Sequence, residues 1–321
     1  MLAGIVGCGD PSGGFLIRPV PADQRLQETV VQSDKGWTGD KIAIIELEGL
    51  IMNARPSFLW NEGENPVSLL AEKLRIAAAD PKVKAVLLRV NSPGGTVQAS
   101  EAMYELLLRF GRQSGKPVVA YIMDMGASGA YYVSCAAGRI LCQSTSITGS
   151  IGVIMQTVSF AGTMQKLGIS ADAICSGPHK DMASPLKELS PEDRKILQDM
   201  INEFYGKFVS VVCAGRKDLS PEKARQLADG RVYTGKQAVE LGLVDRVCDM
   251  QEALDEAKAA AKVKSARVVM YHRPLGYKSN VYSSAADGAG GQALTQFNLL
   301  NVQANDLSLL RRPTFLYLWT E

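Results

Sequence analysis

The segment that decides the fold lies at residues 83–107 and reads VKAVLLRVNSPGGTVQASEAMYELL. Its opening run, 83–91, is almost entirely apolar, which is typical of a strand covered on both faces of a parallel sheet. Residues 92–95 predict a turn, and a helix is expected over 97–112 because apolar residues recur on one stripe. Strand, turn and helix in this order form the building unit of α/β folds.

The same alternation continues on both sides of this unit. Strands are predicted at 41–52, 117–123, 139–143 and 150–158, and helices at 65–80 and 127–137. Three later helices have explicit start signals, at Ser190-Pro191, Ser220-Pro221 and Thr234. The order of these elements predicts an α/β fold with a parallel β-sheet and flanking helices.

Composition limits the function classes. The chain has 321 residues, 46% of them hydrophobic, and a net charge of +2, which gives no electrostatic footprint for nucleic acid. The six cysteines form no CxxC pair, and no metal-ligand cluster is visible, so neither a metal nor another cofactor is expected. No segment approaches the roughly 20 apolar residues that span a bilayer.

The chain is expected to divide into three parts. Residues 1–40 are interpreted as an N-terminal tether, 41–275 as the main folded domain, and 276–321 as a linker followed by a C-terminal helix and apolar tail. The stretch around Cys8, LAGIVGCGD, resembles the bacterial lipoprotein box, in which the cysteine carries the lipid. The other interpretation of this stretch is a disordered start.

Two glycines separate the strand at 83–91 from its helix. Gly94 and Gly95 allow backbone geometries closed to other residues and leave N–H groups open to a ligand at the helix N-terminus. A nucleotide site is less favoured, because neither a dinucleotide-binding fingerprint nor a P-loop pattern is present. The simpler interpretation is a tight turn that merely needs glycine.

The stretch MGASGAYYVS, residues 125–134, holds one hydroxyl, that of Ser128, among small residues. Ser128 follows the strand at 117–123 and precedes a helix, whose N-terminus would stabilise negative charge beside its Oγ. The pattern resembles a nucleophile elbow, although Ala130 stands where GxSxG has its last glycine. The alternative is that the small residues only serve tight helix packing.

A serine nucleophile needs a base, and the sequence offers two kinds. His179 could belong to a Ser-His-Asp triad, while His272, the other histidine, falls in a predicted C-terminal strand. Lys180 lies in the same loop as His179. To act as a base near neutrality, a lysine must lower its pKa of about 10.4 by roughly 3 units, about 4 kcal/mol, which burial can supply. The residues alone leave both bases open.

Five blocks in order resemble the signal peptide peptidase (protease IV) family of serine peptidases, in its single-repeat form. They read NSPGGTVQASE, KPVVAYIMDMGASGAYYVSCAA, STSITGSIGVI, SGPHKDMASP and DGRVYTGKQAVELGLVD. The resemblance implies a Clp protease/crotonase-like fold and a Ser/Lys dyad. It places the nucleophile on Ser128, the general base on Lys180 and the serine that orients the lysine on Ser150. It also places the oxyanion hole on the Gly94-Gly95 backbone, and we expect the Ser128 N–H to be a second donor.

The same resemblance implies a function and a place in the cell. It implies an endopeptidase that hydrolyses apolar peptides, such as remnants of membrane signal peptides, and that assembles into homo-oligomers. It also implies a membrane-associated protein of the cell envelope, with the peptidase domain outside the cytoplasm. Two alternatives share the fold: a crotonase-type acyl-CoA enzyme, which leaves Ser128 and Lys180 unexplained, and a catalytically silent scaffold.

Overall fold

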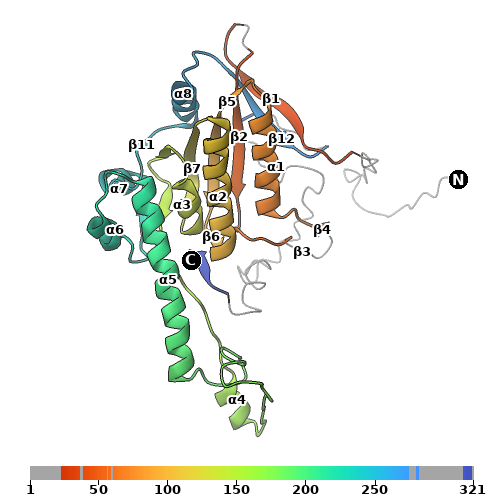
Figure 1. Ribbon diagram of the computed structural model, residues 1–321, viewed down its shortest axis with the longest axis vertical. Helices are drawn as coiled ribbons and strands as arrows, with labels where there is room; N and C mark the ends of the chain where they lie inside the picture. Colours follow the sequence, from red (N-terminus) through yellow and green to blue (C-terminus); the bar gives the residue numbers. More distant parts are fainter. Residues whose placement is uncertain are drawn as a thin grey trace, which may run out of the picture.

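A mostly parallel sheet runs through the centre of the molecule (Figure 1). The computed structural model describes residues 23–36, 39–55, 57–58, 61–274, 280–281 and 314–319. The main sheet has the order β1-β12-β2-β5-β7-β8-β11, with β9 paired to β7 and β10 to β9. All pairs from β12 to β11 along this path are parallel, whereas β1 pairs antiparallel with β12. The predicted α/β fold with a parallel sheet is therefore confirmed.

The strands and helices have the following bounds. The strands are β1 (Gln27–Ser33), β2 (Lys41–Glu48), β3 (Ser57–Phe58), β4 (Asn61–Glu62), β5 (Val83–Ser92), β6 (Gly94–Thr96), β7 (Val118–Ala127), β8 (Arg139–Cys142), β9 (Ile147–Gly149), β10 (Val232–Thr234), β11 (Arg246–Val247), β12 (Arg267–His272) and β13 (Leu316–Leu318). The helices are α1 (Pro66–Ala79), α2 (Val97–Ser114), α3 (Gly129–Ser134), α4 (Ala161–Lys166), α5 (Pro191–Gly215), α6 (Pro221–Leu227), α7 (Gly235–Glu240) and α8 (Met250–Ala260).

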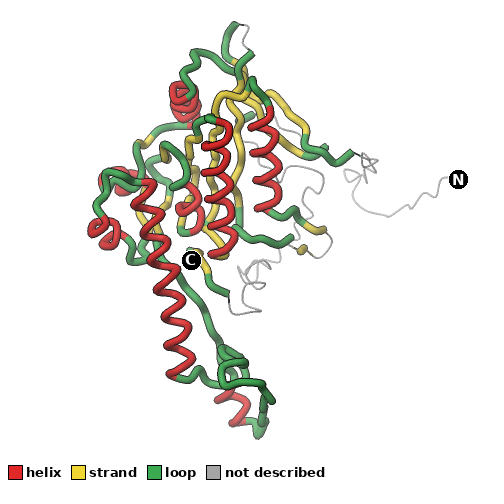
Figure 2. The backbone as a smooth tube through the Cα atoms, viewed as in Figure 1, coloured by secondary structure: helices red, strands yellow, loops and turns green. Residues whose placement is uncertain are grey.

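Helices bury both faces of the sheet, which explains why its central strands are apolar throughout. Successive residues of β2 show this, since Ala43 and Ile45 pack with α1, α2 and α3, whereas Ile42 and Ile44 pack with α8 on the opposite face. The tube in Figure 2 shows the strands between these helices. A strand in this position has no solvent face, so the apolar run at 83–91 correctly predicts β5.

Helix starts follow the capping signals in the sequence. The side chain of Thr96 accepts a hydrogen bond from the Ala99 N–H at 3.3 Å at the start of α2. Ser190 does the same for α5 and Ser220 for α6, each followed by proline at the first helical position. Thr234 begins α7 with a reciprocal capping box. The three starts predicted from Ser190, Ser220 and Thr234 are confirmed.

Four predicted segments differ in the structure. Residues 27–33, expected in the tether, form β1 on the edge of the sheet. The helix predicted at 127–137 is shorter, because Ser128 has a non-helical backbone and α3 begins after it. No strand forms at 150–158, where Ile154 makes an isolated β-bridge with Leu316. The described apolar residues at the C-terminal end form strand β13. Cys8 and most of the predicted linker lie outside the described residues.

A long extension projects from the body of the sheet (Figures 1 and 2). We call residues 155–190, which include α4, the arm; it runs from the body along α5 and ends beyond the end of this helix that lies away from the sheet. The arm is held by its own hydrogen bonds, such as Phe160 N–H to the Pro185 carbonyl at 2.7 Å. Large apolar side chains are nevertheless exposed on it, namely Val158, Phe160, Leu167, Ile169, Ile174 and Leu186. Exposed apolar surface of this kind marks an interaction site.

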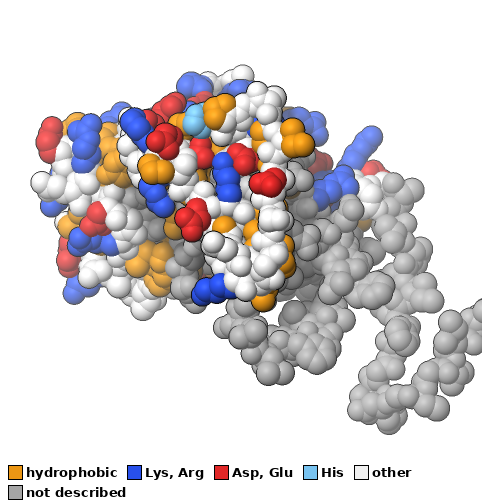
Figure 3. Space-filling model, turned by 90° about the horizontal axis from the view of Figure 1, so that it is seen from below, with side chains coloured by type: hydrophobic (Ala, Val, Ile, Leu, Met, Phe, Trp, Pro, Cys, Tyr) orange, Lys and Arg blue, Asp and Glu red, His pale blue; other side chains and the backbone are white. Residues whose placement is uncertain are grey.

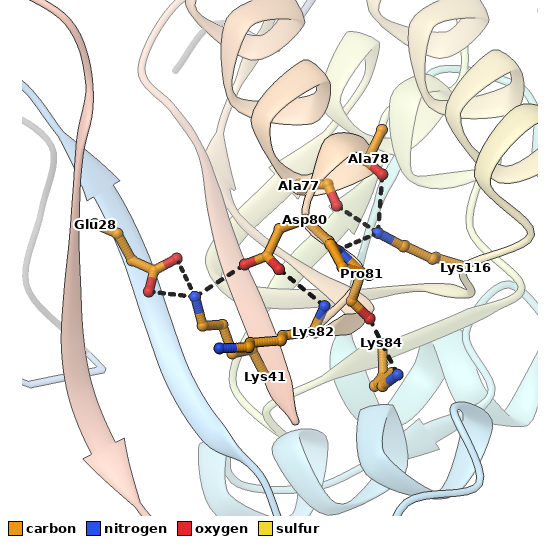
Figure 4. Close-up of polar contacts among 9 residues, drawn as sticks. All are labelled: Glu28, Lys41, Ala77, Ala78, Asp80, Pro81, Lys82, Lys84 and Lys116. Atoms are coloured by element: carbon orange, nitrogen blue, oxygen red, sulfur yellow. Dashed lines mark hydrogen bonds and ion pairs between the residues drawn. The ribbon is translucent and has the colours of Figure 1, made fainter. Parts of the chain in front are cut away.

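A lysine joins the first strands of the sheet to the first helix (Figure 4). The Nζ of Lys41, on β2, donates to Glu28 Oε2 of β1 and to Asp80 Oδ2 at the end of α1, each at 2.9 Å. Burial alone would raise the pKa of Asp80, but hydrogen bonds from Lys41 and from the Lys82 N–H hold this pKa below its ordinary value. The interaction therefore favours the ionised carboxylate in the folded chain.

Replacing Lys41 should make the free energy of unfolding change less with pH in the acidic range. Because folding lowers the pKa of Asp80, its ionised carboxylate stabilises the folded chain fully above the ordinary pKa of 3.8. This stabilisation is lost as the pH falls through the lower pKa of the folded state. We predict that the free energy of unfolding falls less steeply between about pH 5 and pH 3 in Lys41→Met than in the parent. Denaturant titrations at each pH measure this slope. Lys84→Met is the matched control and should keep the parental slope; equal slopes in Lys41→Met and the parent would contradict the prediction.

Candidate active site

Ser128 lies at the turn between β7 and α3 in a backbone conformation rare for a residue with a side chain. Its φ is 51° and its ψ is −116°, and only 1% of the residue is exposed. The Ser128 carbonyl accepts from the Tyr132 N–H at 2.9 Å, which ties the turn to the first turn of α3. Strained backbone at a strand-to-helix turn is the geometry that presents a nucleophilic serine in α/β enzymes.

Ser150 lies beside Ser128 because β9 pairs with the end of β7. Ala127 faces Gly149 in this parallel pairing, so the two serines follow directly on paired residues. Ser150 also has a positive φ, 48°, and its N–H donates to the Arg231 carbonyl at 2.8 Å. Two buried serines, both with a positive φ, therefore lie next to each other where β7 and β9 end. Their proximity agrees with a shared role.

Gly94 and Gly95 approach the same place from the end of β5. A Cβ on Gly95 would lie 1.9 Å from the Ile51 carbonyl oxygen, and one on Gly94 would lie 2.7 Å from the Gly129 nitrogen. Gly94 also has a φ of 103°, which other residues rarely adopt. A Cβ on Gly129 would in turn lie 3.2 Å from the Gly95 nitrogen. Only glycine allows these backbones to come so close.

The backbone hydrogen bonds decide which N–H groups can bind an oxyanion. The Ser128 N–H, expected as a donor, instead donates to the Gly149 carbonyl at 2.8 Å, because the pairing of β7 with β9 continues past Ala127. The Gly94 N–H donates to Ser92 Oγ at 3.1 Å. Of the predicted oxyanion donors, the Gly95 N–H therefore remains. The Gly129 N–H, which the sequence interpretation missed, is the second candidate donor. The glycine directly after the nucleophile was the signal for it.

Lys180 does not lie beside Ser128 within one chain. It is exposed on the arm, where its N–H donates to the Gly177 carbonyl at 3.2 Å. Figure 1 places the arm at the opposite end of α5 from α3. No partner for the Lys180 amine occurs among the described residues. Neighbouring charges are paired instead, since the Lys187 amine lies 2.5 Å from an Asp181 oxygen.

Neither histidine approaches Ser128 within the chain. His179 lies on the arm, with its Nδ1 2.6 Å from Asp193 Oδ1, and this hydrogen bond holds the pKa of the Asp193 carboxyl below its ordinary value. The Nε2 of His272 lies 2.7 Å from Thr29 Oγ1 at the β1–β12 edge. His179 is therefore paired with Asp193, in the first turn of α5, and not with Ser128. In the described part of the chain, no group of three or more His, Cys, Asp or Glu is placed to hold a metal ion.

Comparison with known proteins finds peptidases. The model of peptidase family S49 matches residues 111–264. A protein of Enterococcus faecium with the provisional name signal peptide peptidase SppA is 32% identical over 84% of this chain and 78% of its own length. Protease 4 of Salmonella typhi is 37% identical over 71% of this chain and 36% of its own length. The chloroplastic serine protease SPPA of Arabidopsis thaliana is 30% identical, over 83% of this chain and 40% of the plant protein.

Among solved structures, a variant of a membrane-bound stomatin-specific protease is similar to this chain. It shares 14% sequence identity with a TM-score of 0.45, over 68% of this chain and 86% of that one.

A methyl group on Gly95 should disrupt the site. We predict that Gly95→Ala lowers the free energy of unfolding by about 1–3 kcal/mol or more, because the new Cβ has no space beside Ile51. Gly111→Ala is the matched control: it lies inside α2 with nothing within 4 Å of a new Cβ, and it should gain about 0.5–1 kcal/mol. Denaturant unfolding measures both. Equal stability of Gly95→Ala and the parent would contradict the close approach.

Proposed function

Because this chain belongs to peptidase family S49, the signal peptide peptidase (protease IV) family, we propose that it is a serine endopeptidase with Ser128 as its nucleophile and Lys180 as its general base. Membership in this family agrees with the Clp protease/crotonase-like fold expected from the sequence. The observation that carries the proposal is the position of Ser128 at a strained turn beside the N–H groups of Gly95 and Gly129.

The chemistry follows from these positions. Neutral Lys180 accepts the proton of Ser128 Oγ while Oγ forms a bond to the carbonyl carbon of the substrate. The N–H groups of Gly95 and Gly129 bind the oxyanion, and the protonated lysine then gives its proton to the leaving amine as the carbon–nitrogen bond breaks. A water molecule then attacks the acyl carbon while Lys180 accepts its proton; the bond from this carbon to Oγ breaks, and the protonated lysine returns the proton to Ser128 Oγ. Ser150, adjacent to Ser128, orients the lysine.

The dyad is completed between two copies of the chain. Within one chain, Lys180 is exposed on the arm and away from Ser128, so its own body cannot supply the burial that a lysine base needs. Lowering the pKa of a lysine by roughly 3 units corresponds to about 4 kcal/mol of desolvation and charge interaction. Seating the arm of one copy against the site of the next would bury Lys180 beside Ser128 and Ser150. This arrangement supports a homo-oligomer.

The surface of the arm supports such an assembly. Phe160, Leu167 and Ile169 are each more than half exposed, although they are large and apolar. Figure 3 views the molecule from the arm's end and shows hydrophobic side chains lying between charged ones on this face. Burial against a neighbouring copy would remove this surface from water, at about 25 cal/mol for each Å² of apolar area.

The substrates are proposed to be apolar peptides, such as remnants of membrane signal peptides. We also propose a membrane-associated place in the cell envelope, with the peptidase domain outside the cytoplasm and a lipid on Cys8 as one means of attachment. Cys8 lies outside the described residues. None of the described helices is both long and apolar enough to cross a membrane. Family membership favours hydrolysis of peptides over acyl-CoA chemistry. A measurement of peptide hydrolysis distinguishes the enzyme from a catalytically silent scaffold.

Mixing two inactive variants tests the shared dyad. Ser128→Ala and Lys180→Ala should each lose peptide hydrolysis by a factor of about a thousand or more, because each lacks one half of the dyad. After subunit exchange at equal amounts, about one quarter of the parental activity should return, since a site then combines an intact serine from one copy with an intact lysine from the next. Hydrolysis of an apolar fluorogenic peptide measures both results.

Two controls make this experiment decisive. His179→Ala should retain most of the activity, and a loss as large as that in Lys180→Ala would restore the histidine triad. Each variant mixed with itself should stay inactive. If hydrolysis depends on both residues but never returns on mixing, the dyad lies within one chain.

A further inference from the structure

One buried hydroxyl closes the turn that leads from β5 into β6. Ser92 is the last residue of β5, and it is wholly buried. Its Oγ donates to the Gly49 carbonyl at 2.6 Å and accepts from the Gly94 N–H at 3.1 Å. The hydroxyl therefore serves as donor and as acceptor at once, and it connects the residue that follows β2 with the glycine turn.

The segment after β2 determines which way the Gly95 N–H points. The Ile51 N–H donates to the Gly94 carbonyl, and the Thr96 N–H donates to the Ile51 carbonyl, each at 2.8 Å. This is the pattern of a parallel bridge between Ile51 and Gly95, in which the N–H of Gly95 points away from Ile51. The peptide plane agrees, because the carbonyl of Gly94 and the N–H of Gly95 point in opposite directions across the trans bond that joins them.

The direction of the Gly95 N–H depends on this one peptide plane. The second candidate donor, Gly129, lies beside it, since a Cβ on Gly129 would be 3.2 Å from the Gly95 nitrogen. Two consecutive glycines give the plane more rotational freedom than other residues would. Gly94 has a φ of 103°, and the hydrogen bond from its N–H to Ser92 Oγ restrains the backbone on the other side of its Cα.

Resting on the proposed function, we propose that Ser92 is a positioning residue for the oxyanion hole: its hydroxyl fixes the Gly94–Gly95 peptide so that the Gly95 N–H is aimed at the oxyanion. Without the hydroxyl, the buried Gly94 N–H loses its partner, and rotation of the adjoining backbone lets this N–H find another. That rotation turns the Gly95 N–H away from the substrate. Because Ser92 is wholly buried, it acts on the reaction through Gly95 and not by touching the substrate.

A misplaced oxyanion donor affects the transition state more than the bound substrate. The carbonyl oxygen of the substrate gains its negative charge only as Ser128 Oγ attacks, so the loss falls on kcat and leaves KM nearly unchanged. Removal of one such donor lowers kcat by about a hundredfold to a thousandfold in other enzymes. A donor that is displaced and not removed should cost about tenfold to a hundredfold.

A second serine with the same hydrogen-bond pattern gives a matched control. Ser114 Oγ, at the end of α2, donates to the Phe110 carbonyl at 2.7 Å and accepts from the Lys116 N–H at 3.3 Å. With an apolar fluorogenic peptide, Ser92→Ala should lower kcat by about tenfold to a hundredfold and change KM by less than about threefold. Ser114→Ala loses the same two kinds of hydrogen bond outside the site and should keep both constants within about twofold.

A pair of variants of equal shape separates the hydroxyl from folding. Ser92→Thr keeps a hydroxyl, whereas Ser92→Val carries a methyl group in its place, so both share any crowding from the branched side chain. Circular dichroism and denaturant unfolding check that each variant is folded. We expect kcat to be at least about tenfold higher in Ser92→Thr than in Ser92→Val. Where Ser92→Ala does not fold, this comparison decides.

The outcomes distinguish this inference from the proposed function. If folded Ser92→Ala keeps the parental kcat, or loses no more than Ser114→Ala, Ser92 does not position the donor. Equal kcat in Ser92→Thr and Ser92→Val, or a rise in KM that accounts for the whole loss of kcat/KM, contradicts the inference as well. A parent chain that hydrolyses no peptide would contradict the proposed function itself, and this inference with it.

Discussion

The site depends on how closely three backbone segments approach one another at the ends of β5, β7 and β9. Gly95 reaches within contact of Ile51, and Gly94 within contact of Gly129, with no space for a side chain at either position. The pairing of β7 with β9 then fixes Ser128 through its N–H. A parallel sheet buried on both faces gives these segments a rigid support, which catalysis requires of a site that stabilises a transient charge.

The arm and the body carry different residues of the proposed dyad. The body holds the proposed nucleophile, the proposed oxyanion donors and Ser150, whereas Lys180 is exposed on the arm. A lysine base needs burial and a fixed position beside its serine, and in the proposed assembly the neighbouring copy would supply both.

Local signals in the sequence predicted much of this structure. The apolar run at 83–91 gave the doubly covered strand, and the Ser-Pro pairs at 190 and 220 gave the helix starts, because these features depend on near neighbours. The small residues around Ser128 located the turn for the same reason. Pairing across long distances was not readable: β1 was expected in the tether, and residues 150–158 as a strand. The apolar C-terminal residues showed that something covers them, but not that they pair with β6. Lys180 lies on the arm, away from Ser128, and no local pattern in the sequence specifies this separation.

Ser128 is proposed to be a nucleophile activated by a neutral lysine, Lys180. Mass spectrometry after treatment with a serine-reactive acylating probe tests it most directly. We expect one adduct, on the peptide that contains Ser128, formed faster as the pH rises toward the pKa of the lysine and absent from Lys180→Ala. A chain that hydrolyses peptides while Ser128 stays unmodified, or that is acylated equally well without Lys180, would contradict the account.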